Sequence, residues 1–188
     1  RGTCALGFVG GDTGKLLITK LSEEGIEFDP IHVSNFETRL NVKIMDLSVR
    51  GVTSLNEMGD VVPQSEYDFF IEKYREKIPL AEIVVISGSL PPGMVVGTYF
   101  ELIKTAHKYK KAVFLDCGGP VLKESVKASP FCIKPNKAEF ESMLNKKNLC
   151  DEEIIKESKL LIEKYNIDRV VVTLGQQGAI GVTKDKAV

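Results

Sequence analysis

The sequence lacks several features that mark whole classes of protein. Its 188 residues include no tryptophan and only two histidines, and the formal net charge is −1. A chain so close to neutral has no basic field to attract nucleic acid or an anionic membrane. No apolar run approaches the roughly 18 residues of a membrane span, and the first residues do not have a signal-peptide layout. We therefore expect a cytoplasmic protein that binds neither nucleic acid nor membrane.

Residues that ligate soft metals or form disulfides are also scarce. The four cysteines are widely spaced and include no CxxC pair, which argues against a zinc site or a redox motif. We interpret them as free thiols in a reducing compartment. The two histidines, His32 and His107, lie too far apart in the sequence to suggest a metal cluster, and His107 falls on the surface of a predicted helix.

What the chain does contain, from residue 65 onward, is the pattern of an α/β protein. A helix opened by Ser65 and Asp68 in capping-box spacing is expected to run to about Lys77. Short apolar segments then alternate with amphipathic segments of helical length, which favours right-handed crossovers and a parallel sheet. The predicted strands are 83–86, 113–115, 131–133, 169–174 and 179–182, and the predicted helices are 97–109, 121–127, 136–144 and 152–165.

The first 60 residues show two other patterns. Residues 5–9 form a short apolar strand, and Asp12 or Thr13 can then cap a helix to about residue 24. Residues 38–46 alternate with period two, which is typical of a half-buried strand, and a turn at 48–51 leads to a second candidate strand at 52–57. These two strands are interpreted as a hairpin or small sheet that is distinct from the α/β part.

This organisation predicts two partial domains. Residues 1–33 and 62–188 are assigned to an α/β core, and residues 34–61 to a small β segment. Because a domain rarely begins in the middle of a sheet, we expect that residue 1 is not the natural start of the protein.

The polar face of the strand at 38–46 is the first candidate site. Arg39, Asn41 and Lys43 share one side of a period-two strand, about 7 Å apart per step. Two cations and an amide suit a phosphate-bearing ligand, and arginine can bind phosphate through two hydrogen bonds. The same spacing is also typical of a solvated strand face, so the pattern alone leaves both readings open.

Four further polar segments each follow a predicted strand. They are residues 87–93 (Ser-Gly-Ser-Leu-Pro-Pro-Gly), Asp116, residues 134–139 (Lys-Pro-Asn-Lys-Ala-Glu) and residues 173–178 (Thr-Leu-Gly-Gln-Gln-Gly). Taken singly, each is also explained as a turn, a loop hydrogen bond or a helix cap. The carboxyl ends of parallel strands meet at one sheet edge, however, so these segments should lie together. Two carboxylates, a lysine and glycine turns at one edge indicate a site for phosphate and Mg²⁺.

Six stretches in this order resemble the PfkB, or ribokinase-like, family of carbohydrate kinases. They are GFVGGDTG (7–14), ETRLNVKI (37–44), VVISGSLPPG (84–93), FLDCGG (114–119), IKPNKAEF (133–140) and VVVTLGQQGA (170–179). The resemblance covers nearly the whole chain. Within the family, TRLNVK followed by TSLNEMG (53–59) is most similar to the 1-phosphofructokinases, with tagatose-6-phosphate kinases and the minor 6-phosphofructokinases as near neighbours.

The resemblance implies a fold and a set of roles. The fold is a ribokinase-like parallel-sheet core with helices on both faces and a small β lid that often forms a homodimer. Arg39, Lys43 and Ser89 match sugar-phosphate positions, and Asp116 matches an acidic position near the metal. The nucleotide positions are matched by Lys134, Asn136, Glu139, Thr173, Gly175 and Gly178, and Glu139 also matches a metal position.

The resemblance implies ATP-dependent phosphorylation of D-fructose 1-phosphate with Mg²⁺. The family's glycine-rich sugar-binding segment and its GxGD motif are absent, so no catalytic base is assigned here. We therefore expect a chain truncated at both ends, an inactive fragment of a longer kinase. The alternatives are a tagatose-6-phosphate kinase or 6-phosphofructokinase, and a non-catalytic module that binds nucleotide or sugar phosphate. An NAD-binding Rossmann domain is disfavoured because no GxGxxG joins the first strand to the first helix.

Overall fold

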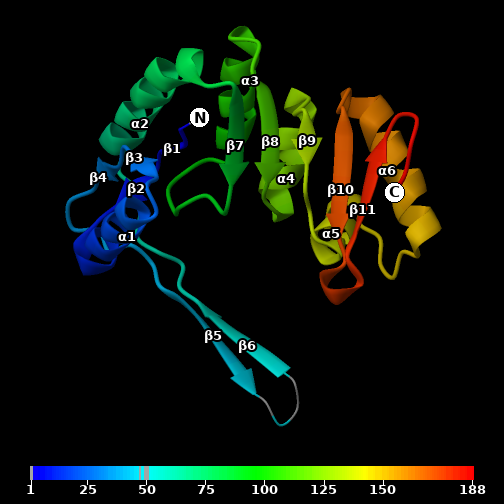
Figure 1. The fold of residues 1–188 in the computed structure, drawn as a ribbon, viewed down its shortest axis with the longest axis horizontal. Coiled ribbons are helices and arrows are strands. Elements are labelled where there is room, and N and C mark those ends of the chain that lie inside the picture. The colour runs from blue at the N-terminus through cyan, green and yellow to red at the C-terminus, as the bar shows by residue number, and fades with distance from the viewer. Residues whose placement is uncertain (1, 47, 49–50) are drawn as a thin grey trace. The chain divides into compact units, whose positions relative to one another are not determined.

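The computed structural model describes residues 2–46, 48 and 51–188. The chain forms two compact units, Arg1–Glu76 with Pro91–Met94, and Lys77–Leu90 with Val95–Val188. Figure 1 labels the helices and strands of both units. The division into a core and a 34–61 segment follows other boundaries and stays a prediction.

The second unit is built on a five-stranded sheet with the strand order β11-β10-β9-β8-β7. Its strands are β7 (Ile83–Ser87), β8 (Ala112–Asp116), β9 (Cys132–Ile133), β10 (Arg169–Thr173) and β11 (Ala179–Thr183). The first four run parallel and β11 runs antiparallel to β10. The predicted α/β architecture is therefore confirmed. The segment at 173–178, which joins β10 to β11, is a hairpin connection.

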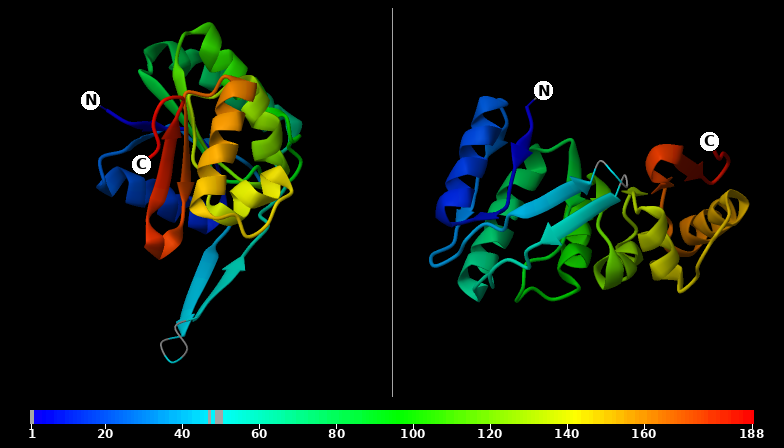
Figure 2. Two further views of the ribbon diagram at one scale, coloured as in Figure 1. Left: turned by 90° about the vertical axis from the view of Figure 1, so that its right-hand side faces the viewer. Right: turned by 90° about the horizontal axis from the view of Figure 1, so that it is seen from below.

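Helices connect the parallel strands of this unit. They are α3 (Thr98–Lys108), α4 (Gly119–Ser125), α5 (Lys137–Leu144) and α6 (Asp151–Tyr165), with short 3₁₀ turns at Ile78–Leu80, Val126–Ala128 and Gly175–Gln177. Figure 2 (left) shows α6 alongside β10 and β11, and α6 contacts both strands. The predicted inward face of α3 is confirmed, because Tyr99, Leu102, Ile103 and Ala106 are all buried. Burial of apolar side chains such as these is the main favourable contribution to the folding of the unit.

The strand β7 differs from its prediction. Residues 83–86 were expected to be buried, but only Ile86 is, whereas Ile83 and Val85 are 56% and 65% exposed. The strand is at one edge of the sheet, and alternate side chains of a strand point to opposite faces. One face of β7 is therefore covered and the other is open within this unit.

The first unit contains short strands and two helices. Its elements are β1 (Cys4–Ala5), β2 (Phe8–Val9), α1 (Gly11–Glu23), β3 (Glu27–Phe28), β4 (Ile31–His32), β5 (Asn41–Asp46), β6 (Gly51–Asn56) and α2 (Gln64–Lys77), whose last residue belongs to the second unit. β1 pairs with β3 and β2 with β4, both in parallel. The predicted single strand at 5–9 is thus interrupted. Phe8 and Phe70 pack together with ring centroids 5.1 Å apart.

The expected hairpin is confirmed, because β5 and β6 pair antiparallel from Asn41↔Asn56 to Asp46↔Gly51. The expected half-buried strand is wrong, since every residue of β5 is exposed. Val42 and Ile44, the supposed inward residues, are 42% and 51% exposed. Part of the predicted turn at 48–51 lies outside the described residues.

Two predicted helix caps are also wrong. The N-cap of α1 is Gly10, without a side-chain cap. The carboxylate of Glu37, distant in sequence, instead accepts hydrogen bonds from the backbone N–H groups of Asp12 (3.3 Å) and Thr13 (2.8 Å). The helix α2 already includes Ser65, so Ser65 is not its cap.

No helix among the described residues is both long and apolar enough to cross a membrane. No disulfide links the four cysteines, all of which lie within the described part of the chain.

Candidate functional site

The carboxyl ends of the four parallel strands bring the polar segments of the second unit together. Ser87, at the end of β7, is in register with Asp116, at the end of β8. The backbone N–H of Lys134, just after β9, donates to the carbonyl of Leu115 at 2.9 Å. Farther along this edge, Asn136 forms a β-bridge with Thr173. The prediction that these segments share one sheet edge is therefore confirmed.

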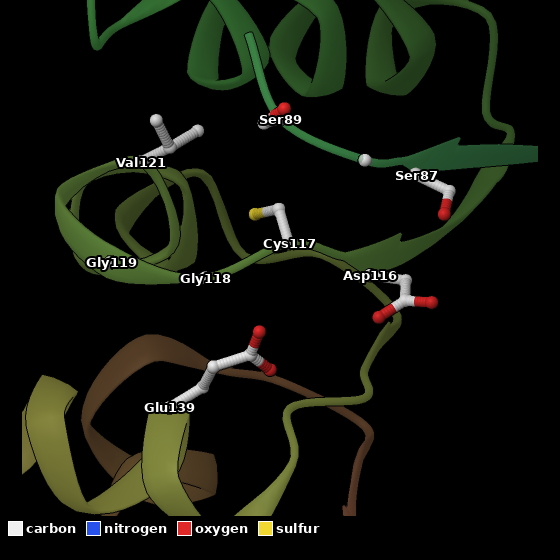
Figure 3. Close-up of a pocket in the computed structure, with 9 residues that line it drawn as sticks. Ser87, Ser89, Asp116, Cys117, Gly118, Gly119, Val121 and Glu139 are labelled. Atoms are coloured by element: carbon white, nitrogen blue, oxygen red, sulfur yellow. The ribbon is translucent and has the colours of Figure 1, made fainter. Parts of the chain in front are cut away.

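A cavity of about 480 Å³ opens at this edge (Figure 3). It is lined by Ser87, Gly88, Ser89, Asp116, Cys117, Gly118, Gly119, Val121 and Glu139. Three of the predicted site residues, Ser89, Asp116 and Glu139, thus line one cavity. Figure 3 shows the carboxylate of Glu139 directed toward Gly118. A Cβ atom added at Gly118 would lie only 2.8 Å from Oε1 of Glu139, so the glycine makes room for this carboxylate.

The position of Glu139 is held by the first turn of α5. Asn136 is the N-cap, and its side chain accepts from the Glu139 N–H at 2.9 Å. In return, Oε2 of Glu139 accepts from the Asn136 N–H at 2.9 Å. The predicted capping box is therefore present. It restrains the Glu139 side chain next to the cavity, at a helix N-terminus whose dipole favours an anion.

Lys134 and Asp116 form an ion pair across neighbouring strand ends. Nζ of Lys134 lies 3.1 Å from Oδ2 of Asp116, and the two side chains are 48% and 39% exposed. The pair places a cation beside Asp116, one of the two carboxylates that line the cavity. A lysine ammonium at such a position is a point charge suited to phosphate.

The donor atoms around the cavity fit Mg²⁺. Asp116 and Glu139 supply carboxylate oxygens, and Ser87 and Ser89 carry hydroxyl groups at the same cavity. No group of three or more His, Cys, Asp or Glu residues that could hold a metal occurs among the described residues. Mg²⁺ prefers oxygen ligands and commonly binds through one or two carboxylates, water and substrate phosphates, so two carboxylates suffice for such a site.

Cys117 had no predicted role and lines the same cavity as Asp116 and Glu139. Burial, and after it the nearby charges of Asp116 and Glu139, raise the pKa of its thiol to about 12. The thiol is therefore neutral near pH 7 and is not an activated nucleophile. Ser87 belongs to the candidate segment 87–93 but was given no role of its own, and it ends a strand in register with Asp116.

The glycine turn after β10 takes a different position. Thr173, Gly175 and Gly178 do not line the described cavity. Gly175 and Gly178 have φ values of 62° and 95°, which glycine adopts far more readily than other residues. The N–H of Leu174 donates to the Gly178 carbonyl at 2.8 Å, which closes the turn.

The predicted sugar-phosphate residues of the first unit, Arg39 and Lys43, lie just before and within the hairpin strand β5. Asn41 and Lys43 are in β5, and period two places both side chains on one face. Arg39 precedes the strand, so the prediction that all three belong to one strand face is wrong for Arg39. A Cβ added at Gly59 would contact Cβ and Cδ of Arg39 at 3.7 Å, so this side chain lies along the returning chain. The N–H of Leu40 donates to Oε2 of Glu57 at 2.8 Å, which joins the segment just before β5 to the segment just after β6.

Comparison with known proteins agrees with this geometry. The family described as pfkB family carbohydrate kinase matches residues 3–188. A 1-phosphofructokinase of Bacillus subtilis is 31% identical over 181 residues, which are 96% of this chain and 58% of that protein. A D-tagatose-1-phosphate kinase of Bacillus licheniformis is 33% identical over 185 residues, 98% of this chain and 59% of that protein.

Solved structures show the same fold. A possible 1-phosphofructokinase from Thermotoga maritima is 27% identical with a TM-score of 0.88, over 99% of this chain and 59% of that one. Phosphofructokinase-2 from Escherichia coli, in complex with potassium, is 25% identical with a TM-score of 0.85, over 100% of this chain and 60% of that one.

The chain belongs to the pfkB family of carbohydrate kinases. It spans less than two thirds of the length of each of these relatives. The family match over residues 3–188 confirms the resemblance drawn from the six sequence stretches.

Proposed function

We propose that the protein transfers a phosphoryl group from ATP to D-fructose 1-phosphate and yields fructose 1,6-bisphosphate. The observation that carries the proposal is the meeting of Lys134, Asp116 and Glu139 at one sheet edge, beside a cavity. Phosphoryl transfer requires mainly positioning and stabilisation of charge, and this set supplies a cation for phosphate and carboxylates for metal. The names of two relatives, 1-phosphofructokinases of Bacillus subtilis and Borreliella burgdorferi, support this substrate.

The nucleotide is assigned to the second unit. Lys134 binds a phosphate oxygen of ATP, and Asn136 contributes through the N-terminus of α5. The glycine turn with Thr173, Gly175 and Gly178 lets the nucleotide approach the backbone closely. Support comes from the β-bridge between Asn136 and Thr173, which joins the two segments along one edge.

Asp116 and Glu139 are assigned to Mg²⁺. The ion, when bound, neutralises charge on the transferring phosphates. Asp116 and Glu139 hold their carboxylates at the cavity for this purpose, the latter restrained by its capping box. No described residue is assigned the role of catalytic base.

Arg39 and Lys43 of the first unit and Ser89 of the second are assigned to the sugar phosphate. We also propose that residues 34–61 act as the lid, that residues 1–33 and 62–188 form the α/β core, and that two copies associate through the lid. The exposure of Met45, Val52 and Leu55 on the hairpin supports this association. Because ATP and sugar phosphates are cytoplasmic metabolites, the protein is assigned to the cytoplasm.

The first alternative is a different ketose phosphate. The D-tagatose-1-phosphate kinase of Bacillus licheniformis is as similar to the chain as the 1-phosphofructokinases are, which favours the epimeric substrate to the same degree. A 6-phosphate substrate is the second possibility within this class, and one structure of the Escherichia coli relative is a complex with fructose-6-phosphate.

The test is an ADP-release assay on the intact protein as encoded. Mg-ATP is supplied with fructose 1-phosphate, tagatose 1-phosphate, fructose 6-phosphate and tagatose 6-phosphate in parallel. The highest kcat/KM for fructose 1-phosphate would support the proposal, and preference for another ketose phosphate would keep the kinase and change its substrate. Turnover with none of the four would favour a non-catalytic binding module.

A further inference from the structure

The ion pair between Lys134 and Asp116 joins two residues to which the proposed function gives different ligands. Lys134 is assigned to phosphate and Asp116 to metal, yet Nζ and Oδ2 are 3.1 Å apart. The contact is supported by the backbone, because the Lys134 N–H donates to the carbonyl of Leu115, the residue before Asp116. The pairing therefore follows from the register of neighbouring strands.

The pair is a weak contributor to folding. Both side chains are roughly 40–50% exposed, and half-exposed ion pairs are screened by water and salt. Asp116 lines the cavity, where Glu139 adds a second carboxylate, and Lys134 reaches this site through its contact with Asp116. With Lys134 in place, the three charged groups sum to −1, and without it they sum to −2. The lysine thus controls the local charge that a ligand meets.

We propose that Lys134 is the resident counterion of Asp116 and that the pair exchanges partners when metal and nucleotide bind together. A divalent ion alone competes with the ammonium group for Asp116. A polyphosphate alone competes with the carboxylate for Lys134. When both bind, each side chain gains a new opposite charge, so neither is left unpaired. The inference rests on the proposed function in one respect, namely that metal and phosphate use this edge.

This exchange couples the two ligands. Each ligand releases the residue that the other requires, so metal raises nucleotide affinity and nucleotide raises metal affinity by the same factor. Direct chelation of the metal by the polyphosphate also couples the two ligands, so coupling alone does not identify the exchange. The discriminating measurement is therefore binding of each ligand by itself, in variants that lack one partner.

The expected effects are crossed. Lys134→Met removes the competing ammonium group, so the affinity for Mn²⁺ alone rises about three- to tenfold, while the affinity for metal-free ATP falls about tenfold or more. Asp116→Asn has the opposite pattern, because it frees Lys134 and removes a carboxylate that repels phosphate. Its affinity for Mn²⁺ falls and its affinity for metal-free ATP rises about three- to tenfold.

The experiment uses the intact protein, with Mn²⁺ binding followed by electron paramagnetic resonance and ATP binding in EDTA followed by calorimetry. Lys146→Met is the matched control, because Lys146 pairs with Glu157 at 2.7 Å away from the cavity lining. It should change neither affinity. Lys134→Arg should retain the wild-type pattern because it keeps the counterion. Circular dichroism establishes that each variant is folded, and Lys134→Gln replaces the Met variant if that one is not.

An unchanged or weakened Mn²⁺ affinity in Lys134→Met would overturn the exchange, as would an unchanged ATP affinity in Asp116→Asn. Failure of the wild-type protein to bind either probe would overturn it as well. The proposed reaction is judged separately by the sugar-phosphate assay. A crossed binding pattern without turnover would support the exchange and argue against the kinase reaction. Turnover without the crossed pattern would support the kinase reaction and overturn the exchange.

Discussion

The carboxyl edge of the five-stranded sheet and the β5–β6 hairpin carry the two sets of candidate site residues, and they differ in what holds those residues. At the sheet edge, Asp116 ends β8 and Lys134 follows β9, and the register of these strands determines their separation. In the hairpin, every residue of β5 is exposed, so both faces of this strand are open among the described residues. Strand register determines the separation of side chains at the sheet edge. On the exposed hairpin, a partner or a ligand is needed to restrict the conformations of the side chains.

The largest expected effect is a loss of stability confined to the sheet. Ile133 of β9 has no exposed surface, so Ile133→Ala should lower the free energy of unfolding by about 2–5 kcal/mol. Ile44→Ala in the hairpin should cost less than about 0.5 kcal/mol because Ile44 is 51% exposed. Urea denaturation measures both. Equal losses would show that the hairpin is packed in solution, which would break the comparison.

The hairpin should affect substrate binding rather than stability. Arg39→Ala is expected to raise KM for the sugar phosphate about tenfold or more, equivalent to about 1.4 kcal/mol, and to leave the midpoint of unfolding unchanged. Lys43→Ala should act in the same direction with a smaller effect, since lysine makes a single-point contact. Steady-state kinetics measure KM, with exposed Lys147→Ala as the control. An unchanged KM in both hairpin variants would remove the hairpin from the substrate site.

The capping box of α5 should affect both stability and the site. Asn136→Ala is expected to cost about 1 kcal/mol of stability, because the Glu139 N–H loses its side-chain acceptor. The Asn136 N–H can still donate to Oε2 of Glu139, but the first turn of α5 that carries Glu139 is less firmly held, so kcat should fall. Asn136→Asp retains an acceptor for the Glu139 N–H and should recover most of the stability. Thermal unfolding and single-turnover kinetics separate the two effects. If Asn136→Ala lowered stability and left kcat intact, the cap would have no part in positioning Glu139.

A smaller effect, a gain in stability instead of a loss, is expected from one substitution inside the second unit. The hydroxyl of Ser158 is fully buried and has no hydrogen-bond partner among the described residues, so Ser158→Ala should raise stability by about 0.5–1 kcal/mol. Ser125 is equally buried but donates to the Val121 carbonyl at 2.7 Å, so Ser125→Ala should lower stability by a similar amount. Matched urea curves test the pair. Changes of the same sign would contradict the assignment of an unpaired hydroxyl.

The smallest expected effect is a pH dependence of stability that comes from Glu37, which precedes β5 and binds the first turn of α1. The N–H of Thr13, and then that of Asp12, hold the pKa of Glu37 below its ordinary value. The folded state therefore binds a proton at Glu37 less readily than the unfolded state does. The stabilisation of the folded state by ionised Glu37 is present above about pH 4.5 and is lost as the pH falls through the folded pKa. Hydrogen exchange of the Thr13 amide should increase over this range. Glu37→Gln should flatten the dependence, and an unaltered pH profile in that variant would contradict the assignment.

Local features of the fold were predictable where neighbours in sequence determine them. The capping box at Asn136 and Glu139 and the inward face of α3 depend on spacings of three and four residues. The cap of α1 was not predictable in this way, because Glu37 lies 24 residues from Thr13. The exposed face of β7 was missed for a related reason, since apolar side chains do not reveal whether anything covers them.

By itself, the sequence determined the alternation of strands and helices, the family, and the placement of polar segments directly after strands, because these depend on periodicity and local spacing. Only the tertiary structure decided that Lys134 pairs with Asp116, that Gly118 makes room for Glu139, and that Cys117 lies beside both carboxylates. These relations join residues from different strands and loops, and their distances are determined by strand register and packing, which no local pattern encodes.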